Sequence, residues 1–237
     1  MPTGYTTESA AIQKKTLNGE YAFGTQICPP GFQNWMNLVQ GGIEPLVIAE
    51  YEYPELLEEW READESILMR QCEMIIDSGM FDYVLLGASG LVTLASPKLF
   101  DKYAFPTIQK ITRLCRQAGM PTMLHSCGKE QYVIERCAMA SDLDCINPLE
   151  IPPMGDCDLA QIKQLYGSKL ALMGNLHTTE VMLRGSVEDV KKAARKAIDD
   201  AAVGGGFILS TGDQCGRDTP DENIFAMVEV ASTYGVY

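Results

Sequence analysis

The chain has 237 residues, 46% of them hydrophobic, which is the composition of an ordinary globular protein. Its 32 acidic and 19 basic residues give a net charge of −13, which argues against nucleic acid and anionic lipid as partners, since both attract positively charged surfaces. No apolar run is long enough to span a membrane, and no secretory signal is present, so we expect a cytoplasmic protein. No two of the eight cysteines form a C-x-x-C pair, and we expect their thiols to be reduced.

The chain divides into a short leader and one domain. Residues 1–20 are polar and are typical of a leader or of the remnant of a helix, whereas residues 21–237 alternate between apolar runs and amphipathic stretches. The apolar runs predict six strands, over Tyr21–Cys28, Tyr83–Ala88, Pro121–Ser126, Asp144–Leu149, Leu170–Gly174 and Phe207–Thr211. The amphipathic stretches predict helices over Glu55–Ser78, Ser96–Ala118 with a kink at Pro106, Glu130–Ala140, Asp158–Tyr166 and Ser186–Val203, and from Thr219 to Thr233.

This alternation of strands and helices predicts a parallel sheet with right-handed crossovers. The strands are apolar throughout rather than alternating, as expected for strands that are buried on both faces. A doubly wound sheet and a (β/α)8 barrel both satisfy the pattern. No predicted strand is followed by a dinucleotide-binding or Walker loop, and Gly204-Gly205-Gly206 precedes a strand, so these glycines do not indicate a phosphate site.

Acidic residues are concentrated between Glu50 and Asp82, where eleven of them stand against two arginines. A solvated face of one helix explains such a stretch, and a surface for a basic partner is the alternative.

Polar residues gather where the predicted strands end, which is the edge at which both candidate folds build their active sites. They are Ser89, His125, Cys127, Asn147, Glu150, Asn175, His177, Asp213 and Cys215. We therefore expect these side chains to contribute to one site.

A zinc site is the most specific chemistry that these residues indicate. His125 and Cys127 are two positions apart, so at a strand end their side chains point to the same face, and imidazole and thiolate together suit zinc. Cys215 follows the last predicted strand and completes three ligands with one open position, which is typical of a catalytic zinc. Glu150 is a candidate fourth ligand. The alternative is that these are buried residues that bind no metal.

Several motifs resemble the uroporphyrinogen decarboxylase superfamily in their order and spacing over residues 21–237. They are Ser96-Pro97-Lys98-Leu99-Phe100 with Pro106, His125-Ser126-Cys127-Gly128, Gly174-Asn175-Leu176 and Asp218-Thr219-Pro220-Asp221-Glu222-Asn223. The resemblance implies a (β/α)8 TIM barrel, here incomplete, because six βα units are predicted and the first two of the family plan are missing. An open sheet exposes unpaired strand edges and apolar barrel lining, so we expect self-association or a partner subunit.

Within that superfamily, the His-x-Cys pattern with a distant Cys is similar to the zinc methyltransferases, which move a methyl group between a corrinoid protein and a thiol, tetrahydrofolate or a methylated donor. The resemblance implies methylcobalamin or cob(I)alamin, carried by that partner protein, as the methyl carrier. His125, Cys127 and Cys215 would be the zinc ligands, with Glu150 as a fourth ligand that substrate displaces.

The resemblance implies further roles for the remaining polar residues. Glu150, Asn175 and His177 would act at the reacting groups, and Ser89, Asn147 and Asp213 would contact the substrate.

Two other functions stay open. A metal-free decarboxylase that binds an anionic tetrapyrrole would need arginines near the strand ends, and only Arg217 qualifies. Asp213-Gln214-Cys215-Gly216 also stands where the decarboxylases carry Gly-His-Gly. The remaining possibility is a truncated homologue that does not catalyse a reaction.

Overall fold

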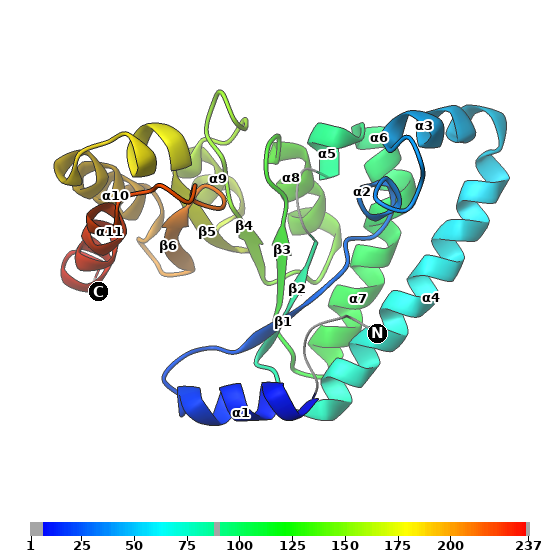
Figure 1. The fold of residues 1–237 in the computed structure, drawn as a ribbon, viewed down its shortest axis with the longest axis horizontal. Helices are drawn as coiled ribbons and strands as arrows, with labels where there is room; N and C mark the ends of the chain where they lie inside the picture. Colours follow the sequence, from blue (N-terminus) through cyan, green and yellow to red (C-terminus); the bar gives the residue numbers. More distant parts are fainter. Residues whose placement is uncertain (1–6, 88–90, 236–237) are drawn as a thin grey trace.

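The computed structural model describes residues 7–87 and 91–235, and its centre is one parallel sheet (Figure 1). The strands are β1 (Gly24–Ile27), β2 (Tyr83–Leu86), β3 (Thr122–His125), β4 (Cys145–Asn147), β5 (Ala171–Leu176) and β6 (Phe207–Thr211). Each strand pairs in parallel with the next in chain order, so β1 and β6 are the edges of the described sheet. All six predicted strands are confirmed, and the fold is an incomplete barrel of the (β/α)8 type.

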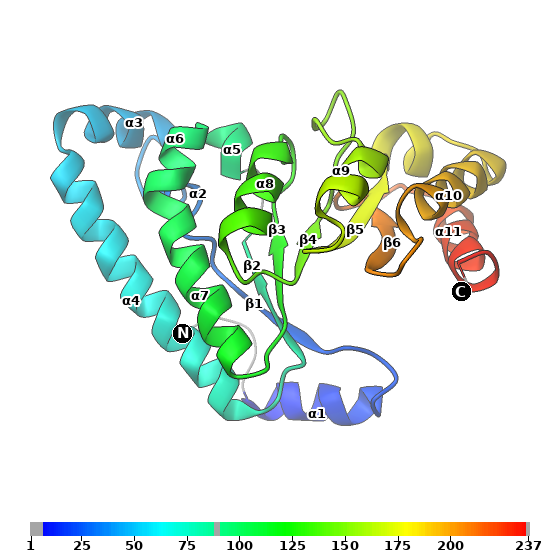
Figure 2. The same cartoon turned by 180° about the vertical axis from the view of Figure 1, so that it is seen from behind.

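Helices connect the strands and cover one side of the sheet, as Figure 2 shows from behind. They are α1 (Thr7–Leu17), α2 (Phe32–Trp35), α3 (Ile43–Glu52), α4 (Pro54–Ser78), α5 (Leu91–Leu94), α6 (Pro97–Leu99), α7 (Phe105–Gln117), α8 (Gln131–Ala140), α9 (Leu159–Tyr166), α10 (Val187–Ala201) and α11 (Asp221–Thr233), with π-helical segments η1 (Phe100–Ala104) and η2 (Thr178–Leu183). Within the described residues, no helix combines the length and apolarity that a membrane crossing requires.

The two faces of the sheet differ in burial. Leu124 of β3 is fully buried and belongs to the main core together with Ile111 of α7 and Ile134 of α8. The neighbouring Met123 and His125 point to the other face and are only half-buried. The expectation of strands buried on both faces is therefore wrong. The inner face of a closed barrel would be covered by the opposite strands, whereas this sheet does not close.

The predicted helix over 96–118 is interrupted. Ser96 caps the short helix α6, η1 follows, and α7 begins at Phe105 with Pro106 in its first turn. Pro106 has no N–H to donate to the carbonyl four residues earlier, so the preceding turn widens into π-helix, and proline then suits the start of the next helix.

A second core lies under α2 and α3, two helices that the sequence did not predict. Trp35 is fully buried, stacks on Trp60 with ring centroids 4.8 Å apart, and donates its indole N–H to Asp64 at 3.1 Å. Burial raises the pKa of Asp64. Tyr103 of η1 packs edge-on against Trp35, so this core ties the start of the domain to the middle of the chain.

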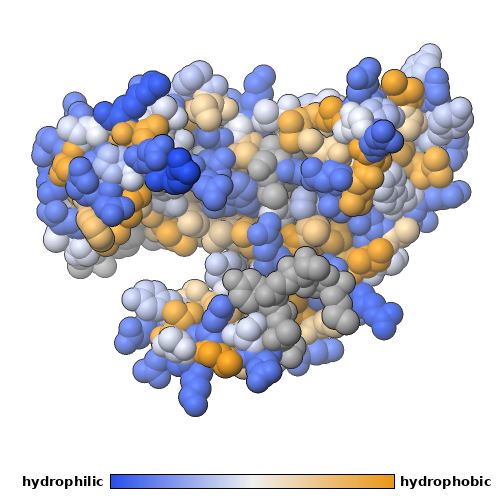
Figure 3. All heavy atoms as spheres, viewed as in Figure 1, coloured by the Kyte–Doolittle hydropathy of each residue, from blue (hydrophilic) through white to orange (hydrophobic). Residues whose placement is uncertain are grey.

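The acidic stretch is divided between contacts within the protein and solvent. Glu65 accepts hydrogen bonds from Arg61 at 3.1 Å and Thr107 at 3.1 Å, and it also pairs with Lys110, which joins α4 to α7. The outer acidic side chains are exposed, namely Glu55, Glu59, Glu62, Glu73 and Asp77. Figure 3 shows apolar atoms among the hydrophilic ones near α3 and the beginning of α4, where Val47, Ile48 and Leu56 are about half exposed.

A capping box at the start of α10 provides a test of the fold. The Ser186 hydroxyl accepts the N–H of Asp189 at 3.2 Å, and the Asp189 carboxylate accepts the N–H of Ser186 at 2.9 Å. We expect Ser186→Ala to lower the free energy of unfolding by about 1 kcal/mol, measured by urea denaturation, because the Asp189 N–H loses its acceptor and the Asp189 carboxylate loses the hydroxyl that donates to it. Ser232→Ala on α11, where the exposed hydroxyl only donates to carbonyls of its own helix, is the control and should change it by less than about 0.5 kcal/mol. Equal effects of the two substitutions would contradict this account.

Candidate functional site

The carboxyl ends of the strands lie at one edge of the sheet because all pairings are parallel. His125, the last residue of β3, lies opposite Asn147 of β4 in the strand register. In the same way Asn175 of β5 lies opposite Ser210 of β6. The register therefore places polar side chains from four consecutive strands at the edge where the sequence predicts the site.

A group with metal-ligand chemistry lies at this edge. Ligand atoms of His125, Cys127 and Asp213 all lie within 4.8 Å of one another, and all three residues are half-buried. The His125 Nε2 atom is 3.7 Å from Asp213 Oδ1. Two ligand atoms that share a tetrahedral zinc at bonds of about 2.0–2.1 Å would lie roughly 3.4 Å apart. The imidazole, thiol and carboxylate thus fit zinc in chemistry and nearly in spacing.

This group differs from the ligand set expected from the sequence. Asp213, which we expected to contact substrate, lies with the histidine and the cysteine. Cys215 and Glu150 lie outside the group. Cys215 is half-buried and packs against the main core, so its role as a ligand stays a prediction.

Glu150 adjoins the group. Its side chain is almost fully buried, and its Oε2 atom accepts the backbone N–H of Gly128 at 2.5 Å. Burial raises the pKa of Glu150, and the charge of Asp213 raises it further. The hydrogen bond from the Gly128 N–H acts in the opposite direction. The carboxyl group therefore interacts electrostatically with Asp213 of the candidate metal-ligand group.

Gly128 is required at this contact. Its φ of 83° lies in the left-handed region, and a Cβ atom there would lie 2.1 Å from the Thr93 hydroxyl oxygen. Any side chain at position 128 would therefore strain the turn whose N–H binds Glu150.

A second buried acid, Glu130, was not expected from the sequence. Its Oε2 atom accepts the N–H of Leu149 at 2.7 Å, while Oε1 has no hydrogen-bond partner among the described residues. Burial raises the pKa of Glu130 well above its ordinary value, and Glu150 and Asp156 raise it further. Asp156 in turn accepts the N–H groups of Glu130 and Gln131 at the start of α8. In sequence, Glu130 resembles an ordinary acid at a helix start, which is why the pattern gave no signal.

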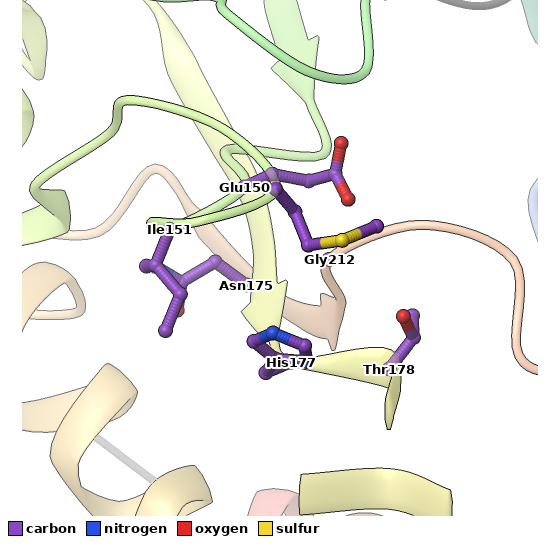
Figure 4. Close-up of a pocket in the computed structure, with 7 residues that line it drawn as sticks. Glu150, Ile151, Asn175, His177, Thr178 and Gly212 are labelled. Carbon is purple, nitrogen blue, oxygen red and sulfur yellow. The ribbon is translucent and has the colours of Figure 1, made fainter. Parts of the chain in front are cut away.

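A small pocket opens beside the metal-ligand group (Figure 4). It is lined by Glu150, Ile151, Met154, Asn175, His177, Thr178 and Gly212. In the close-up, Glu150 lies on one side of the pocket, and His177 and Thr178 lie on the other. The structure thus brings together three residues expected to act at the reacting groups, namely Glu150, Asn175 and His177.

The orientation of the His177 ring is fixed by backbone N–H groups two and three residues further along the chain. Its Nδ1 atom accepts the N–H groups of Thr179 at 3.1 Å and Glu180 at 3.2 Å, which caps η2. Because Nδ1 is an acceptor in both contacts, the ring proton is on Nε2. His177 therefore offers one N–H donor.

Asn147, which was expected to contact the substrate, does not line this pocket. Asn147 has its Nδ2 atom 3.9 Å from the sulfur of Met173, and its Oδ1 atom is buried without a partner in the described part of the chain. Ser89 lies outside the described residues.

Comparisons with known proteins agree on a family. The family model described as uroporphyrinogen decarboxylase (URO-D) matches residues 2–234. Two curated relatives are the methylcobamide:CoM methyltransferase MtbA of Methanosarcina mazei, 27% identical over 162 residues, and the methylcobamide:CoM methyltransferase MtaA of Methanosarcina barkeri, 29% identical over 143 residues. These alignments cover 68% and 60% of this chain but 44% and 38% of the relatives, so the matched part of the chain spans less than half the length of either.

A solved structure shows the same fold. A methyltransferase from Methanosarcina mazei superposes with a TM-score of 0.77 at 18% identity, over 97% of this chain and 64% of the other. This likeness confirms the fold class.

The buried carboxyl of Glu130 gives a test of the site's architecture. A carboxyl whose pKa is raised in the folded state costs stability as pH rises above its unfolded pKa of about 4.3. Glu130→Gln keeps an acceptor for the Leu149 N–H and carries no charge. We therefore expect it to be at least as stable as the unchanged protein at pH 7, with less loss of stability between about pH 4 and pH 7, measured by urea denaturation.

Two further variants complete this test. Glu130→Ala leaves the buried Leu149 N–H without its acceptor and should lower the free energy of unfolding by about 2 kcal/mol. Glu135→Gln changes an exposed acid of the same helix and should have little effect at any pH. A Glu130→Gln protein that is much less stable than the Glu135→Gln protein at pH 7 would contradict our interpretation.

Proposed function

We propose, from the premise that this chain belongs to the uroporphyrinogen decarboxylase family, that it acts in zinc-dependent transfer of a methyl group between a corrinoid protein and a small-molecule donor or acceptor. The observation that carries the proposal is the group of His125, Cys127 and Asp213 at the carboxyl edge of the sheet. Relatives named as methylcobamide:CoM methyltransferases support the reaction class. We expect the methyl carrier to be methylcobalamin or cob(I)alamin on a partner protein.

The metal-ligand group indicates roles for the residues around it. When bound, zinc would lower the pKa of a substrate thiol and so favour the nucleophilic thiolate. His125, Cys127 and Asp213 would hold the metal, and Glu150 stands beside them as the donor that yields its position to substrate. A carboxylate suits this role because it is a weaker zinc donor than a thiolate.

The pocket residues position the substrate. Asn175 and Thr178 offer uncharged hydrogen-bonding groups, and His177 offers an N–H of fixed direction. Ile151 and Met154 contribute apolar contacts to the pocket. Thiols and methyl donors that present both an apolar and a polar part fit this arrangement.

Decarboxylation of an anionic tetrapyrrole is disfavoured by the position of Arg217. This arginine, the only one that the sequence placed near a strand end, has a side chain that is 94% exposed and lies 3.6 Å from Asp218. It therefore offers little to a buried anion.

Zinc content tests the proposal directly. Purified protein should contain one zinc ion per chain by mass spectrometry of metals, and Cys127→Ala should lower the zinc affinity by at least about tenfold, because a thiolate ligand is lost. Cys28→Ala removes an exposed thiol outside the group and should retain the metal. Equal zinc in the Cys127 and Cys28 variants would refute the site assignment.

A second pair of variants distinguishes the ligand set of the structure from that of the sequence. Asp213→Asn should weaken zinc binding more than Cys215→Ala if Asp213 is the third ligand, as its place beside His125 suggests. The reverse order would restore Cys215 as the ligand. The activity test is methyl transfer from methylcobalamin to a small thiol, followed by the absorbance change of the corrinoid, which we expect to disappear with Cys127→Ala.

The open sheet supports the expectation of a partner subunit or self-association. β6 is an edge strand, its Ile208 is 47% exposed, and Phe225 and Val228 of α11 are 69% and 54% exposed. Unpaired backbone groups at such an edge favour pairing with another chain. Light scattering should therefore detect an assembly larger than one chain, and a monomer at every concentration would argue against it.

A further inference from the structure

The pocket beside the metal-ligand group has a charge that restricts its ligand. We infer that it binds an uncharged thiol or methyl thioether with a hydroxyl or carbonyl oxygen on its tail, rather than an anionic thiol. This inference rests on the proposed function and concerns the class of small molecule used.

The charges around the pocket leave no attraction for an anion. A divalent zinc with the thiolate of Cys127, the carboxylate of Asp213 and the neutral imidazole of His125 has a net charge of zero. Glu150 lines the pocket and adds a further acid. The described lining residues include neither lysine nor arginine. A sulfonate or carboxylate tail would therefore lose its hydration without gaining an opposite charge, which is unfavourable.

Cationic side chains on the neighbouring segments do not enter the pocket. Arg184, directly after η2, lies 2.8 Å from Glu180 and is 67% exposed. Lys129, on the loop that carries Cys127, is exposed and is absent from the pocket lining. Each of these cations is thus directed to solvent or paired with an acid of its own segment.

His177 is the specificity-determining residue in this inference. With Nδ1 engaged as an acceptor by two backbone N–H groups, the N–H donor of the ring is at Nε2. Such a donor suits a hydroxyl or carbonyl oxygen, whereas an anion would require a charged partner for comparable binding. Ile151 and Met154 line the same pocket and offer apolar contacts to the carbon chain of such a molecule.

Two thiols that share the same two-carbon chain provide the main test. We would measure the binding of 2-mercaptoethanol and 2-mercaptoethanesulfonate to zinc-loaded protein by titration calorimetry, and we expect the neutral thiol to bind at least about tenfold more tightly. Met154→Lys should reverse or abolish this preference, because residue 154 lines the pocket, is 49% exposed and can hold a lysine without burying it. Met139→Lys, at a 69% exposed site on α8, is the matched control and should leave the preference unchanged.

A second measurement isolates the histidine. The unchanged protein should prefer 2-mercaptoethanol over ethanethiol, which lacks the hydroxyl, and His177→Phe should remove that preference while His177→Gln, which retains an N–H donor, keeps part of it. A merely structural role would weaken both thiols equally and leave the ratio intact, which would overturn the assignment of His177.

The outcomes separate this inference from the proposed function. Protein that binds zinc and prefers the anionic thiol, or binds both thiols equally, overturns the inference and leaves the proposed metal site standing. Protein that binds no zinc overturns the proposed function, and the inference falls with it. Zinc-loaded protein that binds neither thiol overturns the inference alone.

Discussion

The site depends on carboxylates that accept hydrogen bonds from the backbone N–H groups of a neighbouring loop. Glu150 on the β4–α9 loop binds the N–H of Gly128 on the β3–α8 loop, and Glu130 binds the N–H of Leu149 in the reverse direction. Asp156 adds two contacts to the start of α8. Loops between strands carry few regular hydrogen bonds of their own, so these reciprocal contacts hold Cys127 and Glu150 at a defined separation.

The same contacts concentrate acid in a small volume. Two buried carboxyl groups, Glu130 and Glu150, lie near other acids: Glu150 and Asp156 raise the pKa of Glu130, and Asp213 raises the pKa of Glu150. Such an arrangement is costly unless protons or a cation offset the charge. A divalent metal at His125, Cys127 and Asp213 would supply that compensation, which links the architecture of the loops to the chemistry that we propose.

Much of the fold was predictable because regular elements obey local rules. The six strands and the amphipathic helices follow from periodicity, and the spacing of His125 and Cys127 follows from the two-residue repeat of a strand. The sequence does not predict whether Asp213 or Cys215 lies with His125 and Cys127. Both residues lie in the irregular loop after β6, where no periodicity determines which side chain turns inward. The burial of Glu130 could not be predicted because it depends on packing between two loops. Helices α2 and α3 depend on contacts with Tyr103 and Trp60, which are distant in sequence.

The half-exposed inner face of the sheet affects how two reactants could reach one reacting atom. In a closed barrel every ligand must cross the rim formed by the strand ends. Here Met123 and His125 lie on a face that the described strands do not enclose, so the approach along the sheet is also open. The methyl transfer that we propose requires its donor and its acceptor to meet from opposite directions. Separate entrances would let a bulky protein-borne carrier and a small molecule arrive without competing for the same passage.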